Sequence, residues 1–336
     1  MSGRKVVVTG AAGFLGCHLI AELIERDAEI RALVRPGGSR LPPEIADAVE
    51  EVEVDLCRSE SLKKHFEGVE LVFHLAGRYL PGKSDSLLEE LRPSNVETTR
   101  NVVAASLEAG VSRFIHLSSC AAGEESGREL VTEDTGFPVT SYGISKKEGE
   151  KIFRDIPIDR MAWTIFRPTV IFGEHRENPI TRMASAIRSG RFIVFGNGEN
   201  FVNFIYAGDV VSALLQSAEA DVTHGKIYQL ADEPIHFSEL IEIIRTSAGF
   251  PGVIRRLPSF VGHFAGAACD VVSLLTGWKM PLSKLSVRFM TRSMIYSNAK
   301  LKSEAGIEPR SGVREGVERT IRWFMRDRID RRSVPN

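Results

Sequence analysis

A glycine-rich turn between a strand and a helix constrains this chain more than any other feature. Residues 5–9 form a β-branched run that predicts a strand buried on both faces, and residues 10–16 then read G-x-x-G-x-x-G. Apolar residues at helical spacing follow, from Leu19 to Ile24. Such a turn lets backbone N–H groups and the start of a helix approach a pyrophosphate. We therefore predict a dinucleotide site here; the alternative is a tight turn without a ligand.

Further strands are expected at residues 29–34, 52–54, 71–75 and 111–117, with a long helix from Asn95 to Ala109. Alternating strands and helices up to about residue 170 predict an α/β fold with a doubly wound parallel sheet, the Rossmann fold. We expect residues 1–173 and 204–232 to form the NAD(P)-binding domain. Residues 174–203 and 233–336 would form a smaller, mostly helical substrate-binding domain.

Composition excludes several classes of function. The 336 residues carry a net charge of −1, which gives no reason to expect nucleic acid as a partner. No run of 18 apolar residues occurs, so we expect no integral membrane span, and the early strand leaves no room for a signal peptide. The four cysteines, Cys17, Cys57, Cys120 and Cys269, lack metal-site spacing and are expected to be buried, reduced thiols of a cytoplasmic protein without a metal site.

Residues after the second, third and fourth predicted strands bear on the choice of cofactor. Arg35 follows the second strand, where an acidic residue would bind the ribose hydroxyls of NAD. A guanidinium matches a 2′-phosphate, so NADP is favoured, with NAD as the alternative and a solvated surface arginine as the other interpretation. Asp55 is placed to accept a hydrogen bond from the adenine amino group. Ala76 and Gly77 are small enough to allow close approach of a cofactor.

Tyr142 and Lys146 lie four residues apart at the predicted start of a helix, and therefore on one face of it. An ammonium beside a phenol favours the phenolate and lowers a pKa that is ordinarily about 10. The pair suits proton transfer to or from an alcohol or ketone. Ser118 and Ser119 end the fifth predicted strand, at the sheet edge where open α/β folds bind ligands. Cys120, with no base in its sequence context, is interpreted as a packed thiol.

These motifs occur in a characteristic order: T-G-A-A-G-F-L-G at 9–16, D-L at 55–56, H-L-A-G at 74–77, S-S at 118–119 and Y-G-I-S-K at 142–146. In this order they resemble the extended short-chain dehydrogenase/reductase family, the NAD-dependent epimerase/dehydratase group. Residues 167–173 resemble its R-P-x-x-V-Y-G segment and residues 204–210 its F-I-H-V-D-D-V segment. The similarity covers nearly the whole chain and is weakest between about 250 and 300.

The resemblance implies roles for individual residues. Tyr142 would be the acid/base, Lys146 would lower its pKa and bind the nicotinamide ribose, and Ser119, with Ser118 as the alternate, would orient the substrate oxygen. Asn95 would shape the site around the lysine. The implied cofactor-binding residues are Gly10, Gly13, Phe14, Leu15, Gly16, Arg35, Asp55, Leu56, Leu75, Ala76, Gly77, Tyr142, Lys146, Pro168 and Val170. A homodimer through the helices near Asn95 and Tyr142 is also implied.

Two segments bear on the substrate. Many nucleotide-sugar enzymes of the group carry an arginine where this chain has Val202, and valine cannot bind a phosphate; Arg176, Arg182 or Arg191 would have to compensate. Residues 257–277 are apolar apart from His263 and Asp270, and His263 receives no role. They are expected to be a core helix, the lining of a hydrophobic pocket, or a contact with a membrane surface or partner. Such a segment resembles the 3β-hydroxysteroid dehydrogenase and dihydroflavonol reductase-like branch.

The sequence thus predicts an NAD(P)-dependent oxidoreductase that interconverts a secondary alcohol and a ketone on a hydrophobic steroid-, polycyclic- or long-chain-like substrate. One alternative is a nucleotide-sugar epimerase or dehydratase with the same cofactor and triad. Another is a non-catalytic NADP-sensing protein, which retention of the triad disfavours. The polar segment 124–136 is expected to form part of the mouth of the site. A cytoplasmic protein with peripheral membrane contact fits these features.

Overall fold

The structure, a computed structural model, describes residues 1–58, 62–123, 130–250, 252–276 and 282–333. The chain divides into two compact units that interleave in sequence. The first unit comprises residues 1–169, 207–231 and 296–309, and the second comprises residues 170–206, 232–295 and 310–336.

A seven-stranded sheet with only parallel pairings forms the centre of the first unit, in the order β12-β7-β5-β4-β1-β2-β3. This arrangement confirms the predicted doubly wound α/β fold. The strands are β1 (Lys5–Thr9), β2 (Glu29–Val34), β3 (Glu50–Glu53), β4 (Leu71–His74), β5 (Arg113–Leu117), β7 (Ala162–Pro168) and β12 (Lys226–Leu230). The first two match the predicted ranges, β3 differs from its range at both ends, and β4 and β5 differ from theirs by one or two residues at one end.

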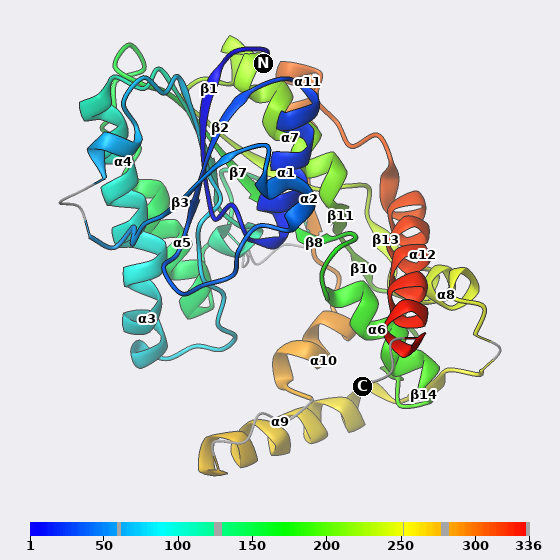
Figure 1. Ribbon diagram of the computed structural model, residues 1–336. Coiled ribbons are helices and arrows are strands. Elements are labelled where there is room, and N and C mark those ends of the chain that lie inside the picture. The colour runs from blue at the N-terminus through cyan, green and yellow to red at the C-terminus, as the bar shows by residue number, and fades with distance from the viewer. Residues whose placement is uncertain (59–61, 124–129, 251, 277–281, 334–336) are drawn as a thin grey trace. The chain divides into compact units, whose positions relative to one another are not determined.

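Helices cover both faces of this sheet. Figure 1 shows α4 (Thr98–Ala109) and α5 (Ser141–Lys151) on one face and α1 (Phe14–Glu25) and α7 (Ala207–Glu219) on the other. Because both faces are covered, the central strands contain apolar residues with no exposed surface, such as Val7 and Phe114. Each fully buried side chain of this size contributes about 1.5–3 kcal/mol to stability. The shorter elements of the unit are α2 (Pro43–Ala46), η2 (Lys63–His65), α3 (Asp85–Arg92), η4 (Cys120–Gly123), β6 (Leu130–Val131), η5 (Asp221–Thr223) and α11 (Ala299–Ala305).

The helix expected to begin at Asn95 begins earlier. It starts at Asp85, where the N-cap Ser84 accepts a hydrogen bond from the Leu87 N–H, and passes through one π-helical turn, η3 (Pro93–Glu97), into α4. A π turn inserts an extra residue into the helix and occurs often at functional sites. Asn95 therefore lies within a distorted turn and not at a helix start.

The second unit is mostly helical and has its own apolar core, which includes Phe172, Phe204, Phe237 and Ile321. Short two-stranded pairings join its strands, for example β8 with β11 and β9 with β14. Its elements are β8 (Val170–Phe172), α6 (Pro179–Arg188), β9 (Ile193–Phe195), β10 (Phe201–Val202), β11 (Phe204–Tyr206), β13 (Ile235–His236), α8 (Phe237–Ser247), β14 (Arg255–Leu257), α9 (Ser259–Thr276), α10 (Lys284–Thr291) and α12 (Gly312–Ser333). A further strand, β15 (Ile295–Tyr296), ends at the boundary between the units.

The unit boundaries differ from the domain boundaries expected from the sequence. Residues 296–309 belong to the first unit because α11 packs beside β12, where the Glu304 carboxylate accepts hydrogen bonds from Lys226 Nζ and the Tyr228 hydroxyl, both at 2.8 Å. Residues 170–173 belong to the second unit because β8 pairs with β11 there.

Two expectations about surfaces can be compared with the structure. The cysteines are unpaired, but the expectation that they are buried is wrong, since Cys57 is exposed and the other three are half-buried. None of the helices in the described ranges is long and apolar enough to cross a membrane.

Candidate active site

The glycine-rich turn after β1 is shaped by backbone packing. Gly10 has a φ of +66°, and a Cβ there would lie 2.8 Å from the Ala76 nitrogen. A Cβ on Gly16 would lie 2.3 Å from the Gly10 oxygen, so only glycine lets α1 start this close to the strand. Gly13 caps α1 without a side-chain hydrogen bond, and the first turn holds no acidic residue. The N–H groups of Phe14 and Leu15 thus begin a helix whose positive end is open to an anion.

The loop after β4 is held by Asn95. Its Oδ1 accepts a hydrogen bond from the Arg78 N–H at 2.7 Å, and its Nδ2 donates to the Arg78 carbonyl at 2.9 Å. The same Nδ2 donates to Ser145 Oγ on α5 at 2.9 Å. A Cβ on Gly77 would lie 3.3 Å from Asn95 Oδ1 and 3.6 Å from Lys146 Nζ. The π turn therefore brings Asn95 between the loop after β4 and helix α5, which carries Lys146. This position is compatible with the role expected for Asn95, which is to shape the site around the lysine.

Helix α5 carries Tyr142 and Lys146 and begins as the sequence predicts. Thr140 caps it by accepting a hydrogen bond from the Gly143 N–H at 3.0 Å. Gly143, between the tyrosine and the lysine, makes close packing possible, because a Cβ there would lie 2.2 Å from the Ala121 oxygen. Ala121 belongs to η4, the 3₁₀ turn that directly follows Ser119. Gly143 thus lets Tyr142 approach Ser119.

The two serines at the end of β5 have different environments. Ser118 is buried, and its hydroxyl donates to Glu150 Oε1 at 2.7 Å. Ser119 is half-buried; its Oγ accepts from the Ala121 N–H at 3.2 Å and shares a hydrogen bond with Tyr142. Ser118 is therefore held in a structural network, and Ser119 is the serine that adjoins the tyrosine.

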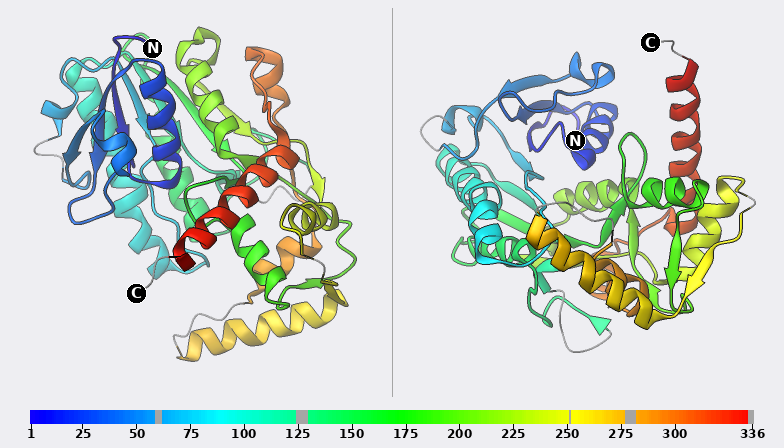
Figure 2. Two further views of the ribbon diagram at one scale, coloured as in Figure 1. Left: turned by 45° about the vertical axis from the view of Figure 1, so that its right-hand side comes forward. Right: turned by 90° about the horizontal axis from the view of Figure 1, so that it is seen from below.

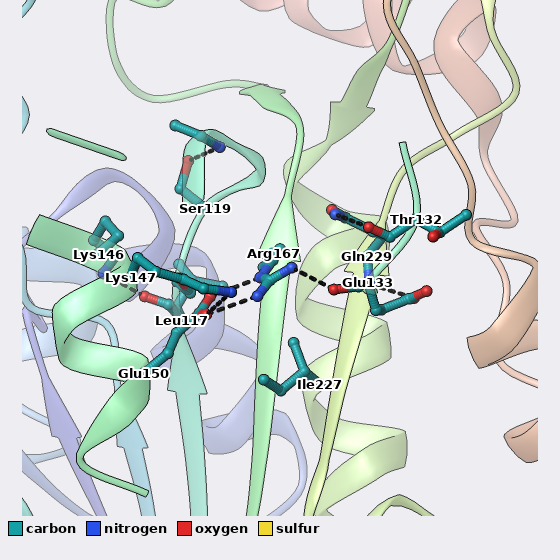
Figure 3. Close-up of polar contacts among 12 residues, drawn as sticks. Leu117, Ser119, Thr132, Glu133, Lys146, Lys147, Glu150, Arg167, Ile227 and Gln229 are labelled. Carbon is teal, nitrogen blue, oxygen red and sulfur yellow. Dashed lines mark hydrogen bonds and ion pairs between the residues drawn. The ribbon is translucent and has the colours of Figure 1, made fainter. Parts of the chain in front are cut away.

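A buried ion pair anchors α5 to the sheet (Figure 3). Arg167 of β7 donates from Nε and Nη2 to the two carboxylate oxygens of Glu150, each at 2.7 Å. Arg167 also donates to the Glu133 carbonyl at 3.0 Å, and Lys147 Nζ lies 3.3 Å from Glu150. Burial alone would raise the pKa of Glu150, but the bonds and charges of Arg167 together with Lys147 and Ser118 leave that pKa below its ordinary value. Glu150 is therefore an anion. Its partners are Arg167 on β7, Lys147 on α5 itself and Ser118 directly after β5.

The pKa values of Tyr142 and Lys146 differ from what the sequence suggests. Burial raises the pKa of Tyr142 to about 12, although the hydrogen bond with Ser119 acts in the opposite direction. Burial lowers the pKa of Lys146 to about 8, opposed by the charge of Glu150. Lys146 Nζ donates to the Leu117 carbonyl at 2.6 Å. The expected lowering of the tyrosine pKa by the lysine is therefore not found, because loss of hydration dominates and the groups that act on the Tyr142 pKa are Ser119, Cys120 and Tyr79.

The other predicted cofactor residues lie at the ends of strands. Arg35 is exposed directly after β2, and a Cβ on Gly38 would lie 3.5 Å from its Nε. Asp55 is half-buried in a turn, where it accepts from the Cys57 N–H at 3.0 Å, and the Leu56 carbonyl accepts from Asn101 Nδ2 at 3.0 Å. Leu75 and Ala76 lie against Gly10. Pro168 ends β7, while Val170 begins β8 in the second unit.

Two neighbours of the site were not predicted. Tyr79 is exposed and meets the Tyr142 ring edge-on at 5.0 Å between centroids. Glu150 could have been predicted, since it follows Lys146 by four residues and so lies on the same helix face.

Within the described residues, no group of three or more His, Cys, Asp or Glu is arranged to hold a metal ion. Residues 124–129 of the predicted mouth, and Gly277, lie outside the described part of the chain.

Val202 occupies the position at which many nucleotide-sugar enzymes of the group carry an arginine. Val202 is 3% exposed and belongs to the core of the second unit. Of the arginines considered as substitutes, Arg182 donates to Glu177 at 2.6 Å and Arg191 donates to Ser189 Oγ at 3.1 Å. Val202 is thus a packing residue.

Comparisons with known proteins show the family of this chain. Residues 6–231 match the model of the NAD dependent epimerase/dehydratase family. The chain is 27% identical over 324 residues, covering 95% of both chains, to N-acetyl-alpha-D-glucosaminyl-diphospho-ditrans,octacis-undecaprenol 4-epimerase of Escherichia coli O157:H7. It is 28% identical over 345 residues, covering 98% of this chain and 93% of the relative, to the decarboxylating sterol-4-alpha-carboxylate 3-dehydrogenase of Mus musculus. The solved UDP-N-acetylglucosamine 4-epimerase of Methanobrevibacter ruminantium M1 has the same fold, with a TM-score of 0.77, 21% identity, and coverage of 97% of this chain and 100% of that one.

Proposed function

The chain belongs to the NAD-dependent epimerase/dehydratase family, and from this membership we propose that it interconverts a secondary alcohol and a ketone on a hydrophobic, lipid-like substrate. It is an NAD(P)-dependent enzyme of the extended short-chain dehydrogenase/reductase type. The observation that carries the proposal is the close packing of α5 at Gly143 on the turn after Ser119, which brings Tyr142 to Ser119 on the helix that also carries the buried Lys146.

The three residues have distinct roles in the proposed reaction. Ser119 Oγ donates a hydrogen bond to the substrate oxygen and stabilises the charge that develops on it. Tyr142 exchanges a proton with that oxygen as general acid or base. Because burial raises the pKa of Tyr142 to about 12, the phenol holds its proton at neutral pH and can donate it to the substrate oxygen. Lys146, fixed by the Leu117 carbonyl, orients the cofactor side of the site.

The glycine turn fits the dinucleotide that the family uses. Gly10 and Gly16 leave no room for a Cβ, and the first turn of α1 presents uncapped N–H groups suited to a pyrophosphate. Lys146 and Gly77 would bind the nicotinamide ribose end. When bound, the nicotinamide supplies or accepts the hydride that changes the oxidation state of the carbinol carbon.

NADP preference follows from Arg35. Its exposed guanidinium lies at the end of β2, whereas the neighbouring Arg40 is already committed to ion pairs with Glu51 and Glu53. We expect Arg35→Ala to weaken NADP binding roughly tenfold and to leave NAD binding unchanged, because a charged hydrogen bond to a 2′-phosphate is worth about 1.5–3 kcal/mol. Titration calorimetry with both cofactors measures this, with Arg40→Ala as the control that should retain its NADP preference. A wild-type protein that binds NAD more tightly would contradict the role of Arg35.

A lipid-like substrate is supported by two observations. The relatives from E. coli and mouse are named for an undecaprenol-linked sugar and a sterol, respectively, and both names include a lipid. The core position of Val202 removes the phosphate-binding arginine of nucleotide-sugar enzymes. In this proposal the second, mostly helical unit binds the substrate.

The second candidate function is epimerisation of a sugar with the same three residues, Ser119, Tyr142 and Lys146. It is favoured by the match to the undecaprenol-linked sugar epimerase over 95% of both chains. In an epimerase, oxidation and reduction of one carbon alternate, so the cofactor shows no net change, whereas a dehydrogenase consumes it. The two functions are therefore distinguishable by following the cofactor.

A substrate panel tests the proposal. Purified protein is incubated with NADPH or NADP⁺ and with 3-oxo- and 3-hydroxysteroids, long-chain 3-oxo and 3-hydroxy esters, and UDP-sugars, while reduced cofactor is followed by absorbance and products by mass spectrometry. We expect net cofactor turnover with a steroid or long-chain compound. Epimerisation of a UDP-sugar without net cofactor change would contradict the proposal.

Homodimerisation through α4 and α5 stays a prediction, and sedimentation velocity tests it. A cytoplasmic location also stays a prediction, and cell fractionation tests it.

A further inference from the structure

Helix α9 of the second unit turns several large apolar side chains outward. Phe260 is 61% exposed, Phe264 76% and Val271 56%. Among the side chains of α9 that the structure describes, the buried positions are glycines: a Cβ on Gly262 would lie 2.5 Å from the Phe195 ring, and Gly266 is buried as well. A helix that belongs to a core has the opposite arrangement, with large residues inside. This exposure excludes the core-helix interpretation of residues 259–272.

The exposed residues form one continuous face. Their positions differ by four and then seven residues, which at 100° per residue places them on one side, and they extend along about 17 Å of helix. Figure 2 shows α9 as a straight helix with α10 running beside it in the same unit. An apolar face of this size marks an interaction surface.

The sequence segment that contains this face is positively charged. Residues 252–295 contain six Lys or Arg and one Asp, a net charge of +5, in a chain whose overall net charge is −1. Two of these residues, Arg255 and Arg256, are exposed on β14 immediately before α9. A two-fold contact with a second copy would place this positive segment against itself, which is unfavourable. An anionic surface complements both the charge and the apolar residues.

We propose that α9 lies flat on an anionic lipid membrane. Phe260, Phe264 and Val271 enter the boundary between headgroups and acyl chains, and Arg255 and Arg256 bind lipid phosphates. The helix does not cross the bilayer, because no helix in the described ranges is long and apolar enough. Membrane attachment is independent of the reaction proposed above, and it is measured without turnover.

Vesicle flotation of the full chain tests this attachment. Two vesicle types are compared, phosphatidylcholine alone and phosphatidylcholine mixed with phosphatidylglycerol. We expect the protein to float with the anionic vesicles and to remain in solution with the neutral ones, with binding reduced by added salt. Arg255→Gln with Arg256→Gln should weaken binding roughly tenfold or more, and Phe260→Ser with Phe264→Ser by a similar factor.

Matched variants elsewhere on the surface serve as controls. Lys63→Gln with Lys64→Gln removes two exposed charges from η2, and Val222→Ser removes a 44% exposed apolar residue. These should float as wild type does, and circular dichroism confirms that all variants are folded. Absence of flotation with both vesicle types, or flotation that none of the α9 and β14 substitutions changes, would overturn the proposal. Loss of an oligomer in Phe260→Ser with Phe264→Ser, without flotation of the wild type, would identify the face as a self-association surface and overturn it equally.

Discussion

At the scale of single residues, the two adjacent serines after β5 have different partners, and only Ser119 adjoins Tyr142. Their place at the end of β5 was predictable, but the choice between them was not, because it depends on Glu150, more than thirty residues later in the chain. The Ser118 hydroxyl is bound to that carboxylate, which leaves Ser119 beside Tyr142. The raised pKa of Tyr142 was also out of reach, because burial is a property of the folded protein and not of the Y-x-x-x-K spacing.

The Glu150–Arg167 pair gives a prediction about stability. Glu150→Gln removes the charge that neutralises a fully buried guanidinium, and breaking such a pair costs about 3–5 kcal/mol. Urea unfolding followed by the fluorescence of Trp163, which lies on β7 with Arg167, measures the loss. The exposed pair Glu242–Arg245 is the control, and Glu242→Gln should leave the free energy of unfolding nearly unchanged. Equal effects of the two substitutions would show that the buried pair does not anchor α5.

At the scale of elements, α5 was predicted but its packing was not. The Y-G-I-S-K pattern indicates a helix, and residue spacing places Tyr142 and Lys146 on one face. It does not reveal that the glycine between them meets the turn after Ser119, because that contact joins two elements. The π turn at Asn95 was missed for a similar reason, since local sequence does not distinguish it from a regular helix start. For α9 the sequence left three interpretations, and exposure of its large residues removed one of them.

Gly143→Ala tests the packing of α5. Alanine ordinarily stabilises a helix by about 1 kcal/mol relative to glycine, but here its Cβ would lie 2.2 Å from the Ala121 oxygen. The helix must move, and Tyr142 moves away from Ser119. We expect turnover to fall roughly a hundredfold, as misplacement by about 1 Å commonly does. Gly252→Ala is the control, because nothing lies within 4 Å of a Cβ there. Unchanged turnover in Gly143→Ala would show that the close contact is not needed.

At the scale of the whole molecule, the fold class was predictable because strand and helix periodicities alternate over the first half of the chain. The seven-stranded parallel sheet confirms it. The assignment of residues 296–309 to the first unit was not predictable, because it depends on long-range contacts such as the hydrogen bonds from Lys226 and Tyr228 to Glu304. The sequence determines the substrate less well than the fold or the site. The segments that bear on the substrate contain packing residues such as Val202, and a packing residue does not indicate which substrate binds.

Two buried histidines predict how stability depends on pH. His74 and His116 stack at 5.3 Å, and among the described residues neither ring nitrogen of His116 has a hydrogen-bond partner. Burial and the Lys146 charge lower the pKa of His74 to about 3 and that of His116 well below its ordinary value. Below pH 6.5 the unfolded chain therefore binds protons that the folded chain does not, so stability falls as pH falls through the range from 6.5 toward 3.

We expect the free energy of unfolding to fall by about 3 kcal/mol between pH 7.5 and 5.5, at about 1.4 kcal/mol per histidine and pH unit below 6.5. His116→Leu should halve this loss, because only His74 then remains. Urea unfolding at both pH values measures it through Trp163, which packs on Phe153 beside His116. A loss of the same size in His116→Leu would assign the effect to other groups.

Whether Tyr142 transfers the proton is tested by comparing turnover and cofactor binding in Tyr142→Phe with those of the wild type. The substitution removes one hydroxyl from a ring whose position is fixed by Gly143 and by Tyr79. Tyr79→Phe, which removes a hydroxyl from the neighbouring ring, is the matched control. If Tyr142 transfers the proton, Tyr142→Phe lowers turnover at least roughly a thousandfold and leaves NADP affinity within severalfold, while Tyr79→Phe retains activity. Turnover by Tyr142→Phe at the wild-type rate would contradict the catalytic assignment.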